Sequence, residues 1–321
     1  MPLRNAHQST RDIVAATVAA AVAAWPHVGS GDKLAVDGAA VDAMRASLQS
    51  AGFGGIVIIG EGEKDEAPML FNGEIVGHPD VVAVSVDWDI AVDPVDGTRL
   101  AAEGLPGAVA VMAAAERGSM LESSEVYMMK KIVSGPAGRA VLDIDATPAE
   151  NIAALAAALG KDIADIRVAV INKARNFELI AQVQEAGAQW IRFDEGDIAM
   201  AVAAATPESG VDLLLGVGGS PEGVVAAVAV KVLGGFMQTR FAPQNDDQVA
   251  RGLAAGYDLD AKFELDDLVS GERFVFVLTG ITDGVLARGV LESDEVLALE
   301  TFILDSALAQ PLTLGHSVPR T

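Results

Sequence analysis

The sequence predicts an α/β fold whose N-terminal part is α+β, and three observations predict it. From residue 147 onward, apolar stretches of strand length alternate with helical stretches, as in a sheet covered by helices. Before that point two helices come first and strands then follow one another. The chain has 321 residues, of which 51 % are hydrophobic, enough for two domains with a core each. We expect an α+β domain over 1–138 and an α/β domain over 139–321, divided at the turn-rich run 134–138.

The N-terminal part contains two expected helices and a series of strands. An Ala-rich helix over 11–25 ends at Pro26 and Gly29, and a second helix ends at Gly52. Short β-branched or apolar runs that end in glycine or acidic residues predict the strands. The expected elements are helices over 11–25 and 39–51 and strands over 55–59, 73–77, 81–92 and 107–115.

The C-terminal part has clearer signals for its elements. Thr147 and Glu150 form a capping box with Pro148 at the first helical position, and Gly160 ends that helix. The rest of the part alternates regularly, and its apolar, broken tail over 286–314 is more strand-like than helical. The remaining elements are strands over 166–171, 189–193, 211–217 and 274–279 and helices over 176–185, 197–205 and 221–233.

Composition excludes several classes of protein. The chain has no Cys, which excludes disulfides, Cys-bound zinc and thiol catalysis and fits a reducing cytoplasm. Its net charge of -23 argues against nucleic-acid and anionic-membrane partners. The apolar stretch 13–25 is shorter than the ~20 residues of a membrane span and lacks the flanks of a signal peptide. We therefore expect a cytoplasmic protein that binds neither nucleic acid nor membranes.

The hexapeptide Asp93-Pro94-Val95-Asp96-Gly97-Thr98 follows the strand expected over 81–92. Proline ends a strand because it lacks a ladder donor, and Gly97 permits a sharp turn. Such a turn can point two carboxylates and a hydroxyl at one spot, and hard divalent cations prefer oxygen clusters of this kind. A metal held there could polarise a phosphoryl group and generate hydroxide. A turn with two solvated acids explains the hexapeptide equally well.

Acidic residues next to glycine end four further apolar runs, at 35–38, 58–63, 194–197 and 216–223. In α/β sheets the strand ends gather at one edge where ligands bind, so the repetition suggests one shared site. A single loop acid would mean little in so acidic a chain. The glycines of 216–223 also precede a helix, where free N–H groups suit a phosphate, although a plain tight turn fits as well. The spacing is neither that of a dinucleotide fingerprint nor that of a P-loop.

Basic residues are scarce, with 22 Lys and Arg against 45 acids. A phosphorylated substrate would need metals or placed cations. Lys33 lies in an early glycine loop, and Lys173 and Arg175 follow the strand expected over 166–171. Cations are mildly unfavourable at a helix start, so this pair favours a second phosphate site over an ordinary solvated pair.

Several motifs together resemble those of the class II fructose-1,6-bisphosphatases. The run Glu61-Gly62-Glu63-Lys64-Asp65-Glu66-Ala67-Pro68-Met69-Leu70 is typical of that branch, and the hexapeptide 93–98 is typical of the wider lithium-sensitive, inositol monophosphatase-like superfamily. Further matching segments follow in the same order over nearly the whole chain: 31–33, 37–40, 127–128, 156–161, 218–225 and 279–282. The resemblance implies a layered α/β/α/β/α sandwich of the sugar phosphatase type with two sheets.

The resemblance also implies roles for individual residues. Asp37, Glu61, Asp93, Asp96, Glu222 and the Val95 carbonyl would hold Mg²⁺ or Mn²⁺. Thr98, Glu61 and Asp65 would be the catalytic residues, with Thr98 orienting or deprotonating the attacking water. The implied substrate contacts are Lys33, Gly97 and Thr98 near the reacting phosphate, and Asp96, Tyr127, Lys173, Arg175, Glu195, Asp197 and Gly219 for the sugar and the distal phosphate.

Three departures from the class II pattern concern the substrate more than the chemistry. Asp96 stands where that branch commonly has Glu, Glu195 stands where Asp is expected, and the segment after Arg240 is shorter. One methylene less at Asp96 would move its carboxylate from the sugar toward the metals.

The expected activity is metal-dependent hydrolysis of the 1-phosphate of fructose 1,6-bisphosphate, by in-line attack of a metal-bound water without a phosphoenzyme. One alternative is a bifunctional fructose/sedoheptulose bisphosphatase. Another is an inositol monophosphatase-like phosphatase, which would not need Lys173 and Arg175 to bind a second phosphate. A non-catalytic sugar-phosphate sensor is the alternative of a different class, and it would need neither Thr98 nor the full acid set. The expected partner is a small-molecule sugar bisphosphate, and the expected assembly is a homodimer or homotetramer.

Overall fold

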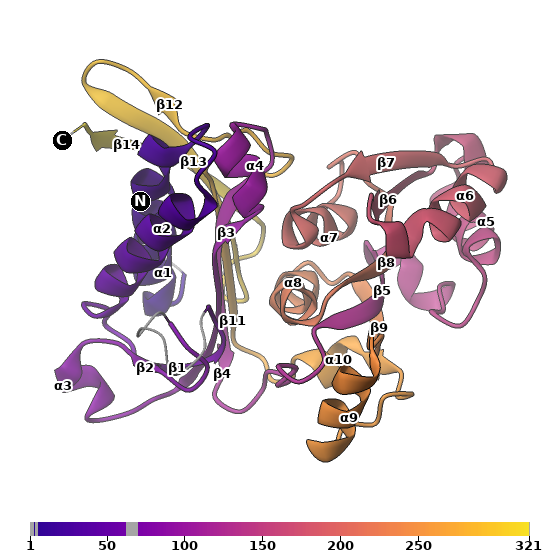
Figure 1. The fold of residues 1–321 in the computed structure, drawn as a ribbon, viewed down its shortest axis with the longest axis horizontal. Coiled ribbons are helices and arrows are strands. Elements are labelled where there is room, and N and C mark those ends of the chain that lie inside the picture. The colour runs from indigo at the N-terminus through magenta and orange to yellow at the C-terminus, as the bar shows by residue number, and fades with distance from the viewer. Residues whose placement is uncertain (1–2, 4–5, 62–69, 321) are drawn as a thin grey trace. The chain divides into compact units, whose positions relative to one another are not determined.

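The computed structural model describes residue 3, residues 6–61 and residues 70–320. The chain forms two compact units, drawn in Figure 1: unit 1 is Met1–Met120 with Gly271–Thr321, and unit 2 is Leu121–Ser270. Each unit combines helices with one mixed sheet, which confirms the predicted α/β class with two sheets.

Unit 1 contains an eight-stranded sheet in the order β12-β13-β11-β4-β3-β1-β2, with β14 paired to β13. β1 and β3 are parallel, and the other neighbours are antiparallel. The strands are β1 (Gly55–Ile59), β2 (Ile75–Val76), β3 (Trp88–Asp96), β4 (Val109–Glu116), β11 (Phe274–Gly280), β12 (Leu291–Glu292), β13 (Val296–Asp305) and β14 (Leu312–Pro319).

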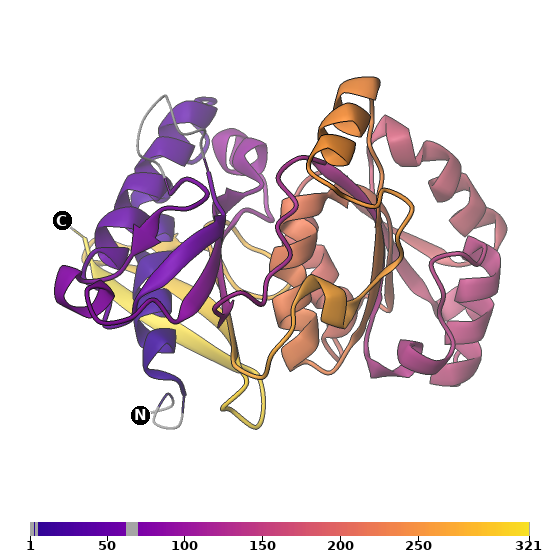
Figure 2. The same ribbon diagram turned by 90° about the horizontal axis from the view of Figure 1, so that it is seen from below.

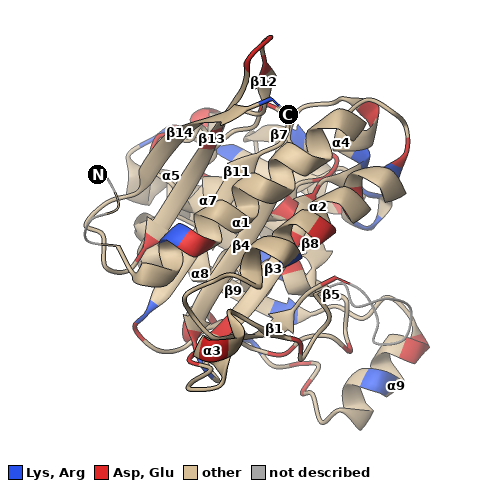
Figure 3. Ribbon diagram, turned by 90° about the vertical axis from the view of Figure 1, so that its left-hand side faces the viewer, with Lys and Arg blue, Asp and Glu red and all other residues tan. Residues whose placement is uncertain are grey.

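The helices α1 and α2 pack on each other, and α1 lies along β4, β11 and β13 of this sheet. Seven of the seventeen residues of α1 are alanine, and the small side chains let its backbone approach the sheet closely. Figure 3 shows α1 almost without charge, since Arg11 and Asp12 are its only charged residues. The helices of unit 1 are α1 (Gln8–Ala24), η1 (Trp25–His27), α2 (Lys33–Leu48), α3 (Pro79–Val82) and α4 (Thr98–Glu103).

Buried polar contacts tie the two ends of the chain together within unit 1. The buried Asp305 at the end of β13 accepts hydrogen bonds from the Thr10 hydroxyl at 2.6 Å and the His7 N–H at 2.8 Å. Deeper in, Thr279 Oγ1 lies 2.8 Å from Thr17 Oγ1 and 2.9 Å from Thr301 Oγ1. Leaving such buried groups unpaired would cost a few kcal/mol each, so the contacts hold α1 against the C-terminal strands.

The two units differ from the two expected segments. Gly138 lies inside unit 2, and residues 271–321 complete the sheet of unit 1 because β11 pairs with β4 over its whole length. Local turn residues do not reveal such a long-range pairing. The domain boundary expected at residue 138 stays a prediction.

Two expectations for the N-terminal part were wrong. The second helix begins at Lys33 rather than residue 39, because the Asp32 side chain caps it by accepting from the Ala35 N–H at 3.0 Å. The strand expected over 81–92 starts at Trp88, since His78 caps the short helix α3 before it.

Unit 2 contains a six-stranded sheet in the order β10-β9-β5-β8-β6-β7. β6 is parallel to both β7 and β8, whereas β5 is antiparallel to β8 and β9. Helices α7 and α8 cover one face of this sheet, and α5 and α6 cover the other, as Figures 1 and 2 show. The strands are β5 (Met128–Ser134), β6 (Arg167–Ile171), β7 (Gln189–Phe193), β8 (Leu213–Gly219), β9 (Phe236–Phe241) and β10 (Phe263–Glu264). The helices are η2 (Pro136–Ala140), α5 (Pro148–Leu159), η3 (Ile163–Asp165), η4 (Ala174–Asn176), α6 (Phe177–Glu185), α7 (Asp197–Ala205), α8 (Ser220–Val232), α9 (Asp246–Ala254) and α10 (Leu265–Leu268).

The alternating elements of the C-terminal part are confirmed, and β7 and α7 have the predicted bounds. The sequence did not predict β5, β9 and α9. The consecutive Lys130 and Lys131 interrupt the apolar pattern of β5, and its antiparallel partners come about 80 and 110 residues later, as the register with β8 and β9 shows. None of the helices in the described part of the chain is both long and apolar enough to cross a membrane.

The capping box of α5 allows a stability test. Glu150 N donates to Thr147 Oγ1 at 3.3 Å, and Thr147 N donates to Glu150 Oε2 at 2.9 Å. Thr147→Ala removes the hydroxyl, so we expect the free energy of unfolding to fall by about 1 kcal/mol in urea titrations. Thr147→Ser keeps the cap and should remain close to the wild type. Equal losses in both variants would contradict the capping role.

Candidate functional site

Two strand ends of unit 1 bring acidic residues to one edge of its sheet. β1 and β3 are parallel neighbours, with Ile59 at the end of β1 paired to Ala91 in the middle of β3. Glu61 comes two residues after β1, and Asp93 and Asp96 lie in the second half of β3. Parallel strands run toward the same edge of a sheet, which brings these acids to one side of unit 1, and their grouping in one shared site stays a prediction.

The strand β3 continues through Pro94, where the sequence predicted a turn. Asp93 pairs with Val111 and Asp96 with Val109, so three steps on β3 face two on β4. This is a β-bulge, in which the unpaired residue tolerates a proline without an N–H. A bulge redirects the side chains around it, and here it lies between the two acids of the motif. Asp93 Oδ1 also accepts from the Val95 N–H at 3.2 Å.

Gly97 makes the turn from β3 into α4. Its φ of 90° is in the left-handed region, and an added Cβ would lie 3.1 Å from Leu100 Cδ1. The turn places Thr98 at the start of α4, where its hydroxyl donates to the Val95 carbonyl at 3.1 Å. Three predicted site residues, Val95, Gly97 and Thr98, are therefore brought together.

Asp37 lies within helix α2, whereas the sequence analysis placed it after an apolar run at a strand end. The helix packs against both β3 and α4, which carry the hexapeptide. Asp37 is half-buried, and burial raises the pKa of its carboxyl group. Lys33, the first residue of α2, is exposed. The predicted catalytic residue Asp65 lies in 62–69, outside the described residues.

Three parallel strands of unit 2 also end at one edge. Lys173 and Arg175 follow β6, Glu195 and Asp197 follow β7, and β8 leads into α8. Gly219 is the last residue of β8 and Glu222 lies in the first turn of α8. The predicted gathering of these strand ends at one edge is therefore confirmed for β6, β7 and β8.

Lys173 and Arg175, the pair predicted to bind a second phosphate and called the clamp below, have specific partners. Lys173 Nζ lies 3.9 Å from Glu195 Oε1, and Arg175 Nε donates to the Val217 carbonyl at 2.8 Å. The buried Asn176, which sequence reasoning missed, accepts from Val217 N at 2.9 Å and donates to Val217 O at 3.0 Å. Its side chain replaces a missing backbone partner and fixes the strand beside the clamp. Arg175 also lines a pocket of about 260 Å³ whose walls are largely apolar.

The glycine-rich segment 216–219 was expected to belong to a turn before a helix. In the structure it forms the end of strand β8. It pairs with β5 up to Gly219 opposite Met128, and α8 starts at the next residue. The Ser220 N–H donates to the Tyr127 carbonyl at 2.9 Å, which places Tyr127 beside the start of α8. The Arg251 guanidinium lies over the Tyr127 ring, 5.1 Å from the ring centroid, in a cation–π contact.

Glu222 and Asp197 lie near a buried cation that sequence reasoning missed. Lys131 Nζ forms an ion pair with Asp197 Oδ2, and all three residues are buried or nearly so. Burial raises the pKa of Glu222, and the Lys131 charge opposes that rise. Glu222 Oε2 has no hydrogen-bond partner in the described part of the chain. The signal for Lys131 was the period of two in a strand, which turns one of two consecutive lysines inward.

The donor atoms suit a hard divalent cation, since carboxylate and carbonyl oxygens are its usual ligands. The buried, unpartnered Glu222 Oε2 is an atom that such an ion would satisfy. Within residues 6–61 and 70–320, no three His, Asp or Glu side chains form a group that could hold a metal. The predicted ligand set, which includes Asp37, Glu61 and Asp93, therefore stays a prediction.

Burial of Glu222 predicts a pH-dependent stability effect in the metal-free protein. Its pKa in the folded state is raised above the ordinary value, so stability falls as pH rises above that ordinary value. Glu222→Gln removes this loss. Relative to the wild type, the variant should therefore gain more unfolding free energy at pH 8 than at pH 5, as measured by urea unfolding in EDTA.

Glu150 provides the control of opposite sign. Hydrogen bonds from Thr147 lower the pKa of the Glu150 carboxyl group. Glu150 therefore stabilises the fold at pH values above the ordinary pKa of Glu, and this stabilisation is lost as the pH falls. Glu150→Gln should therefore be relatively less stable at pH 8 than in acid. The same pH response in both variants would contradict the assignment for Glu222.

Comparison with known proteins identifies the family of this chain. Residues 7–310 match the family model described as bacterial fructose-1,6-bisphosphatase, glpX-encoded. Over 301 residues the chain is 38 % identical to the fructose-1,6-bisphosphatase class 2 of Haemophilus influenzae, covering 90 % of this chain and 89 % of that protein. It is also 38 % identical over 301 residues to the fructose-1,6-bisphosphatase 1 class 2 of Escherichia coli K12, covering 90 % and 88 %. The resemblance seen in the sequence is thereby confirmed, and the chain belongs to the bacterial, glpX-encoded family of class 2 fructose-1,6-bisphosphatases.

Proposed function

We propose that this protein hydrolyses the 1-phosphate of fructose 1,6-bisphosphate to fructose 6-phosphate and phosphate, with the help of divalent cations. Family membership supports the reaction, since the relatives carry this activity in their names. The observation that supports a hydrolytic site most directly is the end of β3, where a bulge between Asp93 and Asp96 is followed by Gly97 and the Thr98 hydroxyl.

The acidic residues are proposed as ligands of Mg²⁺ or Mn²⁺. When bound, such a cation neutralises the charge of the phosphate and makes water a better nucleophile. The proposed ligands are Asp37, Glu61, Asp93, Asp96, the Val95 carbonyl and Glu222, and Asp65 is proposed as a further catalytic residue. The buried and unpartnered Glu222 Oε2 supports its part in this set.

Thr98 is proposed to orient the attacking water. Its hydroxyl proton is donated to the Val95 carbonyl, so the lone pairs of Oγ1 remain to accept a hydrogen bond from water. Water oxygen would bond to phosphorus in line while the bond from phosphorus to the sugar O1 breaks, and the proton that the water loses would be balanced by the one that O1 takes up. Lys33 and Gly97 are proposed to contact the reacting phosphate.

The residues of unit 2 are proposed to hold the rest of the substrate. Lys173 and Arg175 would bind the distal phosphate, because each carries a fixed positive charge held by a neighbouring group. The further proposed sugar contacts are Asp96, Tyr127, Glu195, Asp197 and Gly219. The same clamp would serve any sugar bisphosphate, which makes sedoheptulose 1,7-bisphosphate the second candidate substrate. A cytoplasmic homodimer or homotetramer stays a prediction.

Thr98→Ala tests the role in water orientation. We expect kcat for fructose 1,6-bisphosphate to fall by about 100-fold or more, as for loss of a group that positions a reactant. Phosphate release is measured with Mg²⁺ and with Mn²⁺, together with the thermal unfolding midpoint. Thr98→Ser keeps the hydroxyl and should retain most of the activity. Wild-type turnover in Thr98→Ala with either metal would refute the assignment.

Lys173→Met tests the distal phosphate site. The KM for fructose 1,6-bisphosphate should rise about tenfold or more, because a charge-assisted contact is lost. Release of phosphate from inositol 1-phosphate, which has no second phosphate, should change little. Lys161→Met is the matched control, since Lys161 pairs with Asp212 elsewhere in unit 2. An unchanged KM for the bisphosphate would exclude the clamp.

A further inference from the structure

Lys131 is the one cationic side chain that is fully buried in the described part of the chain, with 1 % of its surface exposed. It lies in the middle of β5, a central strand of the unit 2 sheet. An ammonium group removed from water costs several kcal/mol unless a charged partner compensates it. A lysine is therefore retained at such a position only if its surroundings are built for it.

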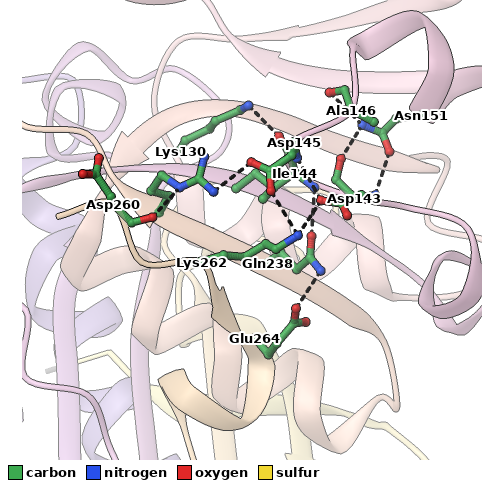
Figure 4. Close-up of polar contacts among 11 residues, drawn as sticks. Lys130, Asp143, Ile144, Asp145, Ala146, Asn151, Gln238, Asp260, Lys262 and Glu264 are labelled. Atoms are coloured by element: carbon green, nitrogen blue, oxygen red, sulfur yellow. Dashed lines mark hydrogen bonds and ion pairs between the residues drawn. The ribbon is translucent and has the colours of Figure 1, made fainter. Parts of the chain in front are cut away.

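The partner of Lys131 is Asp197, the first residue of α7. The Lys131 ammonium forms an ion pair and a hydrogen bond with Asp197 Oδ2. Asp197 is itself 8 % exposed, so both members of the pair are withdrawn from water. Lys130, the preceding residue, points to the opposite face of the sheet and donates to the Ile144 carbonyl at 2.6 Å (Figure 4).

Two glycines leave room for the carboxylates of this group. A Cβ on Gly218 would lie 2.2 Å from Asp197 Oδ2, and one on Gly219 would lie 1.6 Å from Glu222 Oε2. A Cβ on Gly223 would lie 2.5 Å from Met129 Sδ and only in ordinary contact, at 3.4 Å, with Lys131 Cε. Gly218 and Gly219 thus accommodate the two carboxylates, which a side chain at either position would displace.

The two acids of the group are in different situations. The ammonium is engaged with Asp197, while Glu222 Oε2 has no hydrogen-bond partner among the described residues. Without the cation, two carboxylates would be buried close to each other and would repel. Lys131 thereby holds the Asp197 carboxylate in place and offsets part of the negative charge of the group. It leaves Glu222 Oε2 available to another ligand.

We propose that Lys131 is a positioning residue, whose ammonium fixes the Asp197 carboxylate in the orientation that receives the sugar and leaves Glu222 open for a cation. This proposal rests on the proposed function, in which Asp197 contacts the substrate and Glu222 the metal. Lys131 itself touches neither the substrate nor the reacting atoms in this role. Its effect on substrate affinity passes through Asp197.

Lys131→Met tests the proposal, because it removes the ammonium and keeps the length of the side chain. The KM for fructose 1,6-bisphosphate should rise about tenfold or more, with a smaller change in kcat, since Thr98 is untouched. Lys130→Met is the matched control on the same strand and should keep KM within about twofold. An equal KM in the two variants would overturn the proposal.

A double-mutant cycle tests whether the effect passes through Asp197. If it does, Lys131→Met should raise KM far less in the background of Asp197→Asn than in the wild type. Independent, multiplying effects on KM would overturn the proposed path. If Lys131→Met does not fold, Gly218→Ala replaces it, since the added Cβ would displace the Asp197 carboxylate while the buried cation remains. An unchanged KM in Gly218→Ala would also overturn the proposal.

A crystal structure separates this proposal from the proposed function. In Lys131→Met, or in Gly218→Ala, the Asp197 carboxylate should leave the position that it has in the wild type. An unmoved carboxylate would overturn the positioning role whatever the substrate is. Absence of phosphate release from the wild type with either metal would refute the proposed function, and the carboxylate position would still decide the role of Lys131.

Discussion

The parallel pairing of neighbouring strands is the constraint on which the rest of this structure depends. β1 lies parallel to β3 in unit 1, and β6 lies parallel to β7 and β8 in unit 2. Parallel strands end at one edge, so the polar residues that follow them are brought together within each unit although they are far apart in the sequence. The bulge at Pro94 and the direct passage of β8 into α8 at Ser220 are local adjustments at these edges. Without the parallel register, neither would place its side chains near the others.

Charge burial is the second feature of the two units, and it works against stability. Asp37 and Glu222 both have pKa values raised by burial, and Lys131 is withdrawn from water beside Asp197. A protein selected for stability alone would fill such positions with apolar side chains. Elsewhere the same units satisfy their buried polar groups with structural partners, as Asp305 does with His7 and Thr10. Glu222 Oε2, by contrast, has no hydrogen-bond partner in the described part of the chain.

The structure describes the surroundings of Asp96 and Glu195, the two residues expected to depart from the class II pattern. Asp96 is 6 % exposed at the last position of β3, so its shorter side chain is confined by its surroundings and cannot reach as far as Glu would. Glu195 is one methylene longer than Asp and lies 3.9 Å from Lys173. Both differences change the reach of a carboxylate, and neither changes its charge. That they bear on the shape of the substrate and leave the type of chemistry intact stays a prediction.

The sequence by itself determined the elements whose signals lie within a few residues, such as the capping box at Thr147, the stop at Gly160 and the bounds of β7 and α7. It also placed acids at the ends of β1, β3 and β7, because a strand end is visible in the pattern of apolar residues. Only the tertiary structure decided that β3 passes through Pro94, that β11 completes the first sheet, and that Lys131 points inward to Asp197. The physical reason is that these features depend on pairing and packing partners 13 to 171 residues away, as in the registers of β3 with β4 and of β4 with β11. No local pattern of residues encodes such partners.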